Sequence, residues 1–531
     1  MNKKLSHTLA VLFCAAAFFP AHASAQFFNY TEESQEEYLA EDQRVITLID
    51  SSHEYNLDPF TANYTSEAQI LISVNEGLFS YHPETSQPLN ALCSSYKVSR
   101  DKKKWTFTLI SGATFSNGDP ITAETIRSSW IRLLSTPDAP FSSFLDSVRG
   151  AKDFRLGKTD EKSLGIYTRD DATLIVLLDK PMEHLPKLLC NHAFAAISEK
   201  EGVYSGPFVI DSYKDGILEL KKNEKFHDAS SILIPGIRII QSDDIKENTF
   251  AFNNGSADWI DSLADSLKIL NKDAIHIQSN FGTSFLFFKN TNHPWDNASF
   301  RRALLAAIPY DKLREKFYVK AKTLVYPLSG YPEIYGVDDY DPFEAKELMS
   351  EARKENGISE DEKIPLVFAL YDEESEMPLF NLLKEAWEEL GVDLQFQTRP
   401  SYLYNSSIPY WDADLFSYSW IGDFADPLAF LELFRSDSSL NVSLWKNSGF
   451  DSLLDQALIA ENNASHMEKL SKAEQILLDD GEIIPLFHSI SMHIINTSVI
   501  GGWSENPLNI HPFRYLYIRN HTYLIPNIAK L

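Results

Sequence analysis

The chain has 531 residues, of which 48 are Lys or Arg and 75 are Asp or Glu, for a formal net charge of −27 at pH 7. So acidic a surface makes nucleic acid a poor partner, because the phosphate backbone needs basic residues. A chain of this length exceeds what one hydrophobic core usually supports, so two large lobes are expected.

The N-terminus has the pattern of a secretory signal peptide over residues 1–25. Two lysines precede an apolar run at 9–19, and small residues lead up to Ala25. This run is far shorter than the roughly 20 residues of a spanning helix, so we expect cleavage after Ala25 and export to the periplasm. Cys14 follows the bulky Phe13, which favours a soluble mature chain over a lipidated one.

Two cysteines remain after this cleavage, Cys93 and Cys190. An even count in an oxidising compartment permits a disulfide between them. The alternative is two buried thiols that act as small apolar residues. Neither has a second Cys or a His at metal-ligand spacing, so a metal site built from them is not expected. No cofactor is expected either.

The first clear elements are a strand and a helix. Apolar and polar side chains alternate over 105–109, and the turn at 117–120 ends the strand. A helix should begin next, because Thr122 can cap it and Glu124 suits the positive end of its dipole. Four apolar residues form its buried stripe: Ile126, Trp130, Leu133 and Leu134.

Later segments predict more of both structures. Residues 208–213 and 217–220 flank Asp215-Gly216, which indicates a β-hairpin. A strand at 364–370, a helix at 379–390 and a strand at 392–398 predict a βαβ unit. Two further helices are expected: 342–355, capped by Asp341, and 466–480, ended by Gly481. The fold class is therefore α/β.

Local signatures of catalysis are missing from the sequence. It holds no zinc-protease motif, no nucleophile turn and no dinucleotide loop. Residues 157–159 approach a phosphate loop, but Lys152 stands where that loop requires Gly. A non-enzyme is expected, and an exported hydrolase without local signatures remains the competing class.

A series of short segments resembles the peptide and nickel class of periplasmic solute-binding proteins, closest to the oligopeptide-binding ones. These segments are Leu57-Asp58-Pro59, Asn75-Glu76-Gly77-Leu78, Trp105-Thr106-Phe107, 115–124, Gly206-Pro207-Phe208, 300–304 and Asp423-Phe424-Ala425-Asp426-Pro427. Their order covers essentially the whole mature chain.

The resemblance implies a two-lobed periplasmic binding protein fold of the class II type, cluster C, with an extra subdomain inserted in the first lobe. The first lobe would contain 26–75, 205–281 and 486–531, the inserted subdomain 76–204, and the second lobe 282–485. Such a monomer would capture oligopeptides between closing lobes and deliver them to the permease and ATPase of an inner-membrane ABC transporter.

The resemblance also places ligand-binding residues. In relatives, a Trp followed three residues later by an Asp lies in the cleft, and the carboxylate holds the peptide α-amino group. The corresponding segment here contributes Trp420, Asp423 and, between and before them, Gly422 and Ser419. Alternatives are a helix cap for Asp423 and a core position for Trp420.

Weaker matches complete the predicted site. Phe141 stands where relatives carry a cleft Tyr, so it can close the cleft but cannot offer a hydroxyl. Asn63, Tyr64 and Thr65 match an extended segment that contacts ligand in relatives, with an ordinary lobe-one strand as the alternative. His488, near the return into the first lobe, is the last candidate.

One departure bears on the ligand. Where some relatives carry arginines for the ligand's C-terminal carboxylate, this chain has Ser417 and Ile408. That carboxylate must be met by another group, by water or not at all. A binder of dipeptide, haem, nickel chelate or another small solute is therefore an alternative, as is an adhesin or chaperone-like holder.

Overall fold

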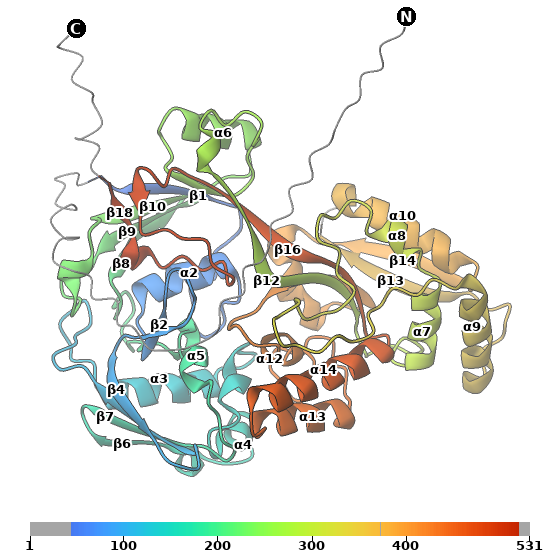
Figure 1. Ribbon diagram of the computed structural model, residues 1–531, viewed down its shortest axis with the longest axis horizontal. Helices are drawn as coiled ribbons and strands as arrows, with labels where there is room; N and C mark the ends of the chain where they lie inside the picture. Colours follow the sequence, from blue (N-terminus) through green and yellow to red (C-terminus); the bar gives the residue numbers. More distant parts are fainter. Residues whose placement is uncertain (1–43, 372, 520–531) are drawn as a thin grey trace, which may run out of the picture.

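The computed structural model describes residues 44–371 and 373–519. The predicted signal peptide, with Cys14, lies outside these residues. They form two lobes side by side, with a smaller subdomain that carries β4–β7 and α3–α5 beneath the first (Figure 1). Each helix within this described part is too short or too polar to cross a membrane.

One mixed sheet of ten strands runs through both lobes. Its order across the sheet is β14 (Val392–Thr398), β13 (Ile364–Leu370), β15 (Leu415–Ile421), β12 (Ile275–Phe288), β16 (Ile483–Ile495), β11 (Trp259–Asp261), β1 (Ile46–Asp50), β10 (Gly236–Gln241), β9 (Ile217–Lys222) and β8 (Phe208–Lys214). The last five strands belong to the first lobe, and β13–β15 belong to the second.

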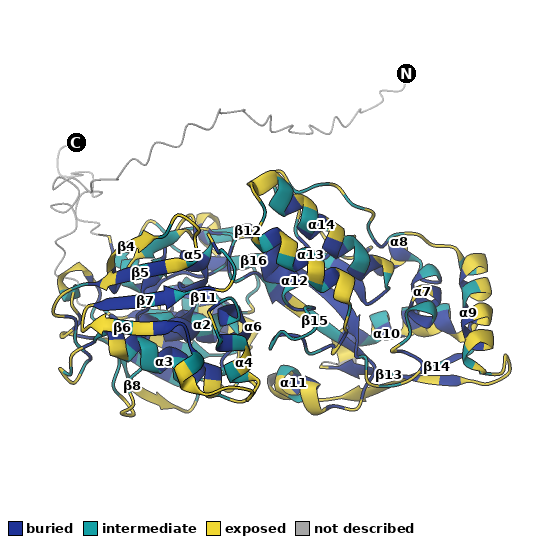
Figure 2. Cartoon of the chain, turned by 90° about the horizontal axis from the view of Figure 1, so that it is seen from below, coloured by how far each residue is buried: buried dark blue, intermediate teal, exposed yellow. Residues whose placement is uncertain are grey.

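Two long antiparallel strands, β12 and β16, connect the lobes (Figures 1 and 2). The first part of β12, 275–279, pairs with 490–494 of β16 beside the first-lobe strands. The second part, 283–287, pairs with 483–488 and also with β15 of the second lobe. The register is interrupted between the two parts, so the connection has a break in its ladder at 280–282.

The subdomain is built on a four-stranded antiparallel sheet covered by α3 (Ala123–Ser135). Its strands, in order, are β4 (Cys93–Val98), β5 (Lys104–Leu109), β7 (Thr173–Leu177) and β6 (Ile166–Asp170). The predicted strand and helix are both confirmed here. Thr122 caps α3 by accepting a hydrogen bond from the Thr125 backbone N–H at 3.4 Å, and the four predicted stripe residues are buried.

The other predicted elements form with small shifts in their starts. The hairpin β8–β9 turns at Asp215 and Gly216, which both have positive φ. Strands β13 and β14 pair in parallel around α10 (Glu373–Glu388), which starts six residues before the predicted helix. Helix α9 (Pro342–Asn356) begins after its Asp341 cap as predicted. Helix α14 (Asn463–Asp479) begins three residues early, because Asn462 caps it.

The remaining regular elements are short and connect these layers. They are α2 (Thr65–Val74), α4 (Ala151–Arg155), α5 (Leu185–Leu188), α6 (Ile245–Asn253), α7 (Ala298–Ala306), α8 (Tyr310–Leu313), α11 (Ser401–Ser407), α12 (Leu428–Leu431), α13 (Ser448–Leu458), β2 (Phe79–Tyr81), β3 (Pro88–Asn90), β17 (Ile500–Gly501) and β18 (Tyr517–Ile518).

Separate apolar clusters fill the two sides of the molecule. The first-lobe core gathers around Trp259, whose ring meets those of Trp503 and Phe513. A larger cluster runs from the subdomain into the second lobe, where the Phe144 and Phe424 rings lie 6.1 Å apart. Buried positions follow the strands, and the outer faces of helices such as α9 are exposed (Figure 2).

The structure corrects the expectation of a possible disulfide, because Cys93 and Cys190 are both free thiols and both buried. The Cys93 thiol donates to the Ser95 carbonyl at 3.2 Å, and the Cys190 thiol lies 3.4 Å from the Pro186 carbonyl. Each thiol is satisfied within its own surroundings, which matches the alternative of two buried apolar residues.

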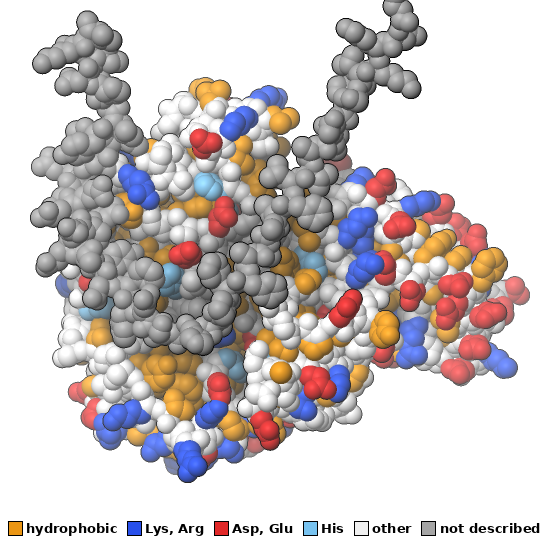
Figure 3. Space-filling model, viewed as in Figure 1, with side chains coloured by type: hydrophobic (Ala, Val, Ile, Leu, Met, Phe, Trp, Pro, Cys, Tyr) orange, Lys and Arg blue, Asp and Glu red, His pale blue; other side chains and the backbone are white. Residues whose placement is uncertain are grey.

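Charged residues of both signs are mixed over the visible surface, and acidic ones gather at the end of the second lobe that carries α9 and α10 (Figure 3). This distribution agrees with the net negative charge of the chain.

Candidate functional site

A cavity of about 640 Å³ lies between the lobes. The first lobe contributes the start of α2, and the subdomain contributes Tyr81, Phe141, Asn191 and His192. The second lobe contributes residues of α10 and α11 and β15 from Ser417 onward, and parts of β12 and β16 complete the lining. Enclosure by both lobes is what a bound small molecule requires.

Eight of the nine predicted site residues line this cavity. They are Asn63, Tyr64, Thr65, Phe141, Ser419, Trp420, Gly422 and Asp423. These residues come from three distant parts of the chain, and the fold brings them together around the cavity. The residues on β15 are adjacent because the strand carries them along the cavity.

Asp423 stands just beyond the end of β15 and faces the subdomain. Its Oδ1 accepts a hydrogen bond from Asn191 Nδ2 at 3.2 Å, and its carbonyl lies 3.5 Å from the Tyr81 hydroxyl. Asn191 is oriented for this contact, because its Oδ1 accepts from the Ala193 backbone N–H at 3.0 Å. Asp423 Oδ2 is shielded from solvent and has no hydrogen-bond partner among the described residues.

The charged form of the Asp423 carboxyl is therefore less stable here than it is in water. Burial raises the pKa of Asp423 to about 7, and the Asn191 hydrogen bond only partly opposes the increase. A cation placed beside Oδ2 would restore the missing interaction as a charge-assisted hydrogen bond. The helix-cap alternative does not apply, since Asp426 accepts the first backbone N–H of α12, from Leu428, at 3.0 Å.

Trp420 is buried, and it also lines the cavity. Its Nε1 donates to the Ala429 carbonyl at 3.0 Å, and its ring stacks on Tyr418 with centroids 6.3 Å apart. The adjacent Gly422 is required by close packing, because a Cβ there would lie 2.7 Å from Cδ1 of Phe281. Trp420 and Gly422 therefore pack in the core of the second lobe and also form part of the cavity wall.

The segment 63–65 is not a strand, which corrects that alternative. It leads into α2, where Tyr64 is the N-cap residue and Thr65 the first helical one. Glu67 Oε2 accepts from the Tyr64 backbone N–H at 3.3 Å, so the helix start holds this part of the cavity wall.

Phe141 closes the subdomain side, with its ring 5.5 Å from that of His192. His488 does not line the cavity. Its Nδ1 lies 2.9 Å from Thr283 Oγ1, and its ring packs against Tyr326 at 5.1 Å. Burial lowers the pKa of His488 to about 4, so it is a neutral interior residue of the strand pair. The sequence predicted that His488 lies near the return into the first lobe, but it did not show toward which face of the strand the side chain points.

The sequence missed a second acidic group in the wall, Glu376 on α10. Ser417 Oγ donates to Glu376 Oε1 at 2.7 Å, and the Tyr371 backbone N–H donates to Oε2 at 2.8 Å. Tyr404 Oη accepts from the Ser417 backbone N–H at 2.9 Å and fixes this end of β15. No local motif marks these residues, because packing of α10 and α11 on β15 brings them together.

The wall is acidic and otherwise neutral. Asp423 and Glu376 are its carboxyl groups, and no Lys or Arg lies among the described residues that line it. His192 adds no charge, since burial lowers its pKa to about 4. Within residues 44–371 and 373–519, no group of three or more His, Cys, Asp or Glu is arranged to hold a metal ion.

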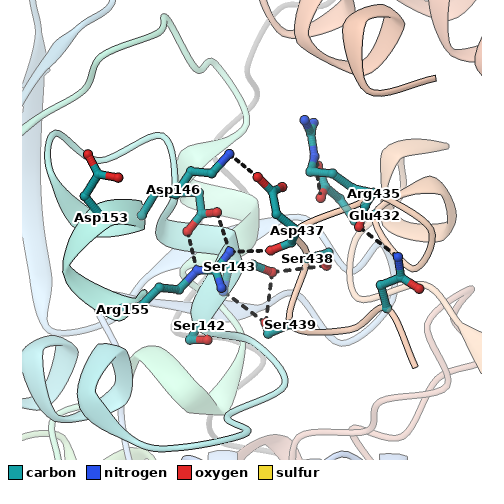
Figure 4. Close-up of polar contacts among 12 residues, drawn as sticks. Ser142, Ser143, Asp146, Asp153, Arg155, Glu432, Arg435, Asp437, Ser438 and Ser439 are labelled. Atoms are coloured by element: carbon teal, nitrogen blue, oxygen red, sulfur yellow. Dashed lines mark hydrogen bonds and ion pairs between the residues drawn. The ribbon is translucent and has the colours of Figure 1, made fainter. Parts of the chain in front are cut away.

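Beside the cavity, an ion-pair network joins the subdomain to the second lobe (Figure 4). Arg155 on α4 makes two hydrogen bonds to Asp146, at 2.7 and 2.6 Å, and also donates to the Asp437 carbonyl at 2.5 Å. Lys152 forms an ion pair with the Asp437 carboxylate. The guanidinium is thus oriented by its own subdomain toward the opposite lobe.

A pair of serine contacts lies next to this network (Figure 4). Ser439 Oγ donates to the Pro140 carbonyl at 2.6 Å and accepts from the Ser143 backbone N–H at 3.2 Å. The Ser143 and Ser438 hydroxyls are 3.2 Å apart. These bonds form only when the subdomain and the second lobe are in contact.

Two lobes that enclose a cavity and meet through polar contacts are the architecture of a solute-binding protein. A model of the family described as "Bacterial extracellular solute-binding proteins, family 5 Middle" matches residues 87–441, and the chain belongs to this family. The members found by comparison are binding proteins rather than enzymes.

Individual relatives agree over most of their length. The oligopeptide-binding protein OppA of Bacillus subtilis is 26% identical over 466 residues, which cover 82% of this chain and 85% of that protein. The crystal structure of Haemophilus influenzae OppA in complex with RPPGFSPFR has a TM-score of 0.81 at 20% identity and covers 90% of this chain and 100% of that one.

The murein tripeptide binding protein MppA of Escherichia coli was matched in two forms, each at 23% identity. One structure gives a TM-score of 0.80 over 90% of this chain and 99% of that one. The unliganded open form gives only 0.61 over 91% and 99%.

Proposed function

We propose that this protein captures oligopeptides between its closing lobes and holds the peptide's α-amino group at Asp423. The observation that carries the proposal is the buried, unpartnered Oδ2 of Asp423 on the cavity wall. A free α-amine has a pKa near ~8 and is mostly cationic at neutral pH, so it supplies the missing charge and donors. The names of relatives, which include OppA with a bound peptide, support the same ligand class.

The remaining wall suits a peptide main chain. Strand β15 lies along the cavity and offers hydroxyl side chains at Ser417 and Ser419, with Trp420 as a rigid surface between them and Asp423. A peptide can lie in extended form beside such a strand, where main-chain contacts give affinity that depends weakly on sequence.

Closure is proposed to take place about β12 and β16. The lobe boundaries expected near 281–282 and 485–486 are supported by the register break in β12 at 280–282. Residues 76–204 would then move with the first lobe and carry Asn191 and Arg155 toward the second.

The family membership supports an extracytoplasmic role, and we propose that the mature protein is a periplasmic monomer that delivers peptide to an ABC permease and ATPase. It would bind without turnover. Incubation with a peptide mixture should return intact peptides, and fragments would favour a hydrolase.

The central test compares Asp423→Asn with the wild type. Binding of free-amine peptides should weaken far more than binding of the same peptides after N-acetylation, because only the former place a cation at Oδ2. Equal losses for both sets would refute the amine anchor. Native mass spectrometry of protein purified without denaturation should identify the retained ligand.

A further inference from the structure

His192 is a residue of the cavity wall that the sequence did not single out. It begins the short helical turn His192–Phe194 of the subdomain and is 2% exposed. Its Nε2 lies 3.3 Å from the Ala62 carbonyl oxygen. A carbonyl oxygen can only accept a hydrogen bond, so Nε2 carries the proton of the neutral ring. Nδ1 is therefore an acceptor, and it is shielded from solvent without a hydrogen-bond partner among the described residues.

The surroundings of the His192 ring keep it neutral and hold it at the cavity. The Phe141 ring packs edge-on against it, with centroids 5.5 Å apart and planes at 89°. Burial lowers the pKa of His192 to about 4, so the lone pair of Nδ1 is free of a proton at neutral pH. Ala62 directly precedes the wall residues 63–65, and the bond from Nε2 therefore holds the ring beside this part of the wall.

Asn191 connects His192 to Asp423. Its Nδ2 donates to Asp423 Oδ1 at 3.2 Å, and its Oδ1 accepts from the Ala193 backbone N–H at 3.0 Å. The turn that contacts the Asp423 carboxyl thus also carries His192. The wall therefore has two buried acceptors without a partner among the described residues, Asp423 Oδ2 and His192 Nδ1. A ligand that satisfies both must bring two donors to this end of the cavity.

We propose that His192 Nδ1 accepts a second N–H of the ligand's α-ammonium group, beside the one that Asp423 Oδ2 accepts. The inference rests on the proposed function, because it needs the amino terminus of a peptide at Asp423. An α-ammonium group has three N–H donors, and each donor that loses its water on enclosure needs an acceptor in the protein. The site therefore selects a primary amine over an amine that keeps the charge but has fewer N–H groups.

A water molecule is the competing partner for Nδ1. A second cavity, of about 20 Å³, also reaches His192, on the side of Asn75 and Arg514. This volume is enough for one water. The two partners differ in their effect on binding, because a water at Nδ1 makes the affinity independent of the number of N–H groups on the ligand's amine.

The test compares alanine peptides of three to five residues with the same peptides after N,N-dimethylation of the amino terminus. Both forms are cationic at neutral pH, but the dimethylated amine keeps a single N–H, which Asp423 can accept. Isothermal titration calorimetry should show the primary amine binding the wild type ten- to a hundredfold more tightly, the range of one hydrogen bond to a charged group. Equal affinities of the two forms for the wild type would overturn the proposal.

Two variants separate the acceptor Nδ1 from the structural bond of Nε2. In His192→Gln the amide can reach the position of Nε2 and donate to the Ala62 carbonyl, but no polar atom stands at Nδ1. Its preference for the primary amine should fall to less than threefold. In His192→Asn the amide oxygen can take the position of Nδ1 and the bond to Ala62 is lost, so the preference should remain while the melting temperature falls.

A full preference in His192→Gln would show that the bulk of the methyl groups causes it, and the proposal would be wrong. The outcomes also separate this inference from the proposed function. If N-acetylated alanine peptides bind the wild type as tightly as free-amine ones, the amine anchor at Asp423 fails. If acetylation weakens binding and dimethylation does not, the role of His192 alone fails, and this wild-type comparison holds even where neither variant folds.

Discussion

Replacement of Asp423 by Asn should stabilise the ligand-free protein at high pH, although it removes the proposed amine anchor. The folded-state pKa of Asp423 is about 7, against an ordinary value of 3.8. The folded protein thus binds this proton more tightly than the unfolded chain does. The resulting destabilisation is absent below pH 4, increases between pH 4 and 7, and is complete above pH 7.

The magnitude of this destabilisation follows from the folded-state pKa and the ordinary pKa of Asp423. A difference of about three pH units at about 1.4 kcal/mol each gives a destabilisation of the closed form on the order of 4 kcal/mol at pH 8, and opening of the lobes, which exposes Asp423, lowers its effect on the ligand-free protein. An Asn side chain is neutral at every pH and keeps an oxygen for the Asn191 hydrogen bond, which the wild type makes at 3.2 Å. The variant should therefore avoid this destabilisation.

The assay is thermal unfolding of ligand-free wild type and Asp423→Asn at pH 4 and pH 8. The melting temperature of the variant, relative to the wild type, should be higher at pH 8 than at pH 4. Asp361→Asn, at an exposed position, should show no such pH-dependent difference. The reasoning is refuted if the relative stability of Asp423→Asn is the same at both pH values or falls at pH 8.

Three further predictions follow from the same structure. Affinity for a free-amine peptide should fall about tenfold per pH unit below pH 7 as Asp423 is protonated, while titration calorimetry of the N-acetylated peptide should show no such loss. Ser439→Ala removes two bonds between the subdomain and the second lobe, worth about 1 kcal/mol each, and should speed peptide release up to about thirtyfold in stopped-flow measurements. Ser350→Ala, on the exposed side of α9, is its control, and an unchanged release rate in Ser439→Ala would contradict the contact's role. Cys93 and Cys190 should both react with a thiol reagent after unfolding without reductant, but not in the native protein, where burial raises the pKa of Cys93 to about 11. A lack of reactive thiols after unfolding would indicate a disulfide instead.

The sequence predicted a feature correctly where the residues that determine it lie close together along the chain. Helix α3 and the hairpin at Asp215-Gly216 are encoded by caps, turns and periodicity within about a dozen residues, so their prediction needs no tertiary contact. The cavity wall along β15 was found through family resemblance, which carries long-range information. Glu376 had neither signal, because its position depends on the packing of α10 against Ser417.

The errors have a similar cause. His488 lies on a strand whose register shifts near Pro485, so its face could not be deduced from simple alternation along the chain. The start of α10 was placed too late, since Pro378 lies inside the helix, where proline removes a backbone hydrogen bond yet is tolerated. In each case a local rule was overridden by packing in the second lobe.

The position of Asp423 explains how one ion pair could control closure. Its partners Asn191 and Tyr81 belong to the subdomain, so its buried environment exists only when the lobes meet. A ligand shifts a conformational equilibrium only by its difference in affinity between the two states. The serine and arginine contacts between the lobes can be exchanged for water at a net free energy of about 0.5–1.5 kcal/mol each. The closed state is then held weakly without ligand, and under the proposed function the buried charge of Asp423 opposes it until the peptide's cationic amine binds.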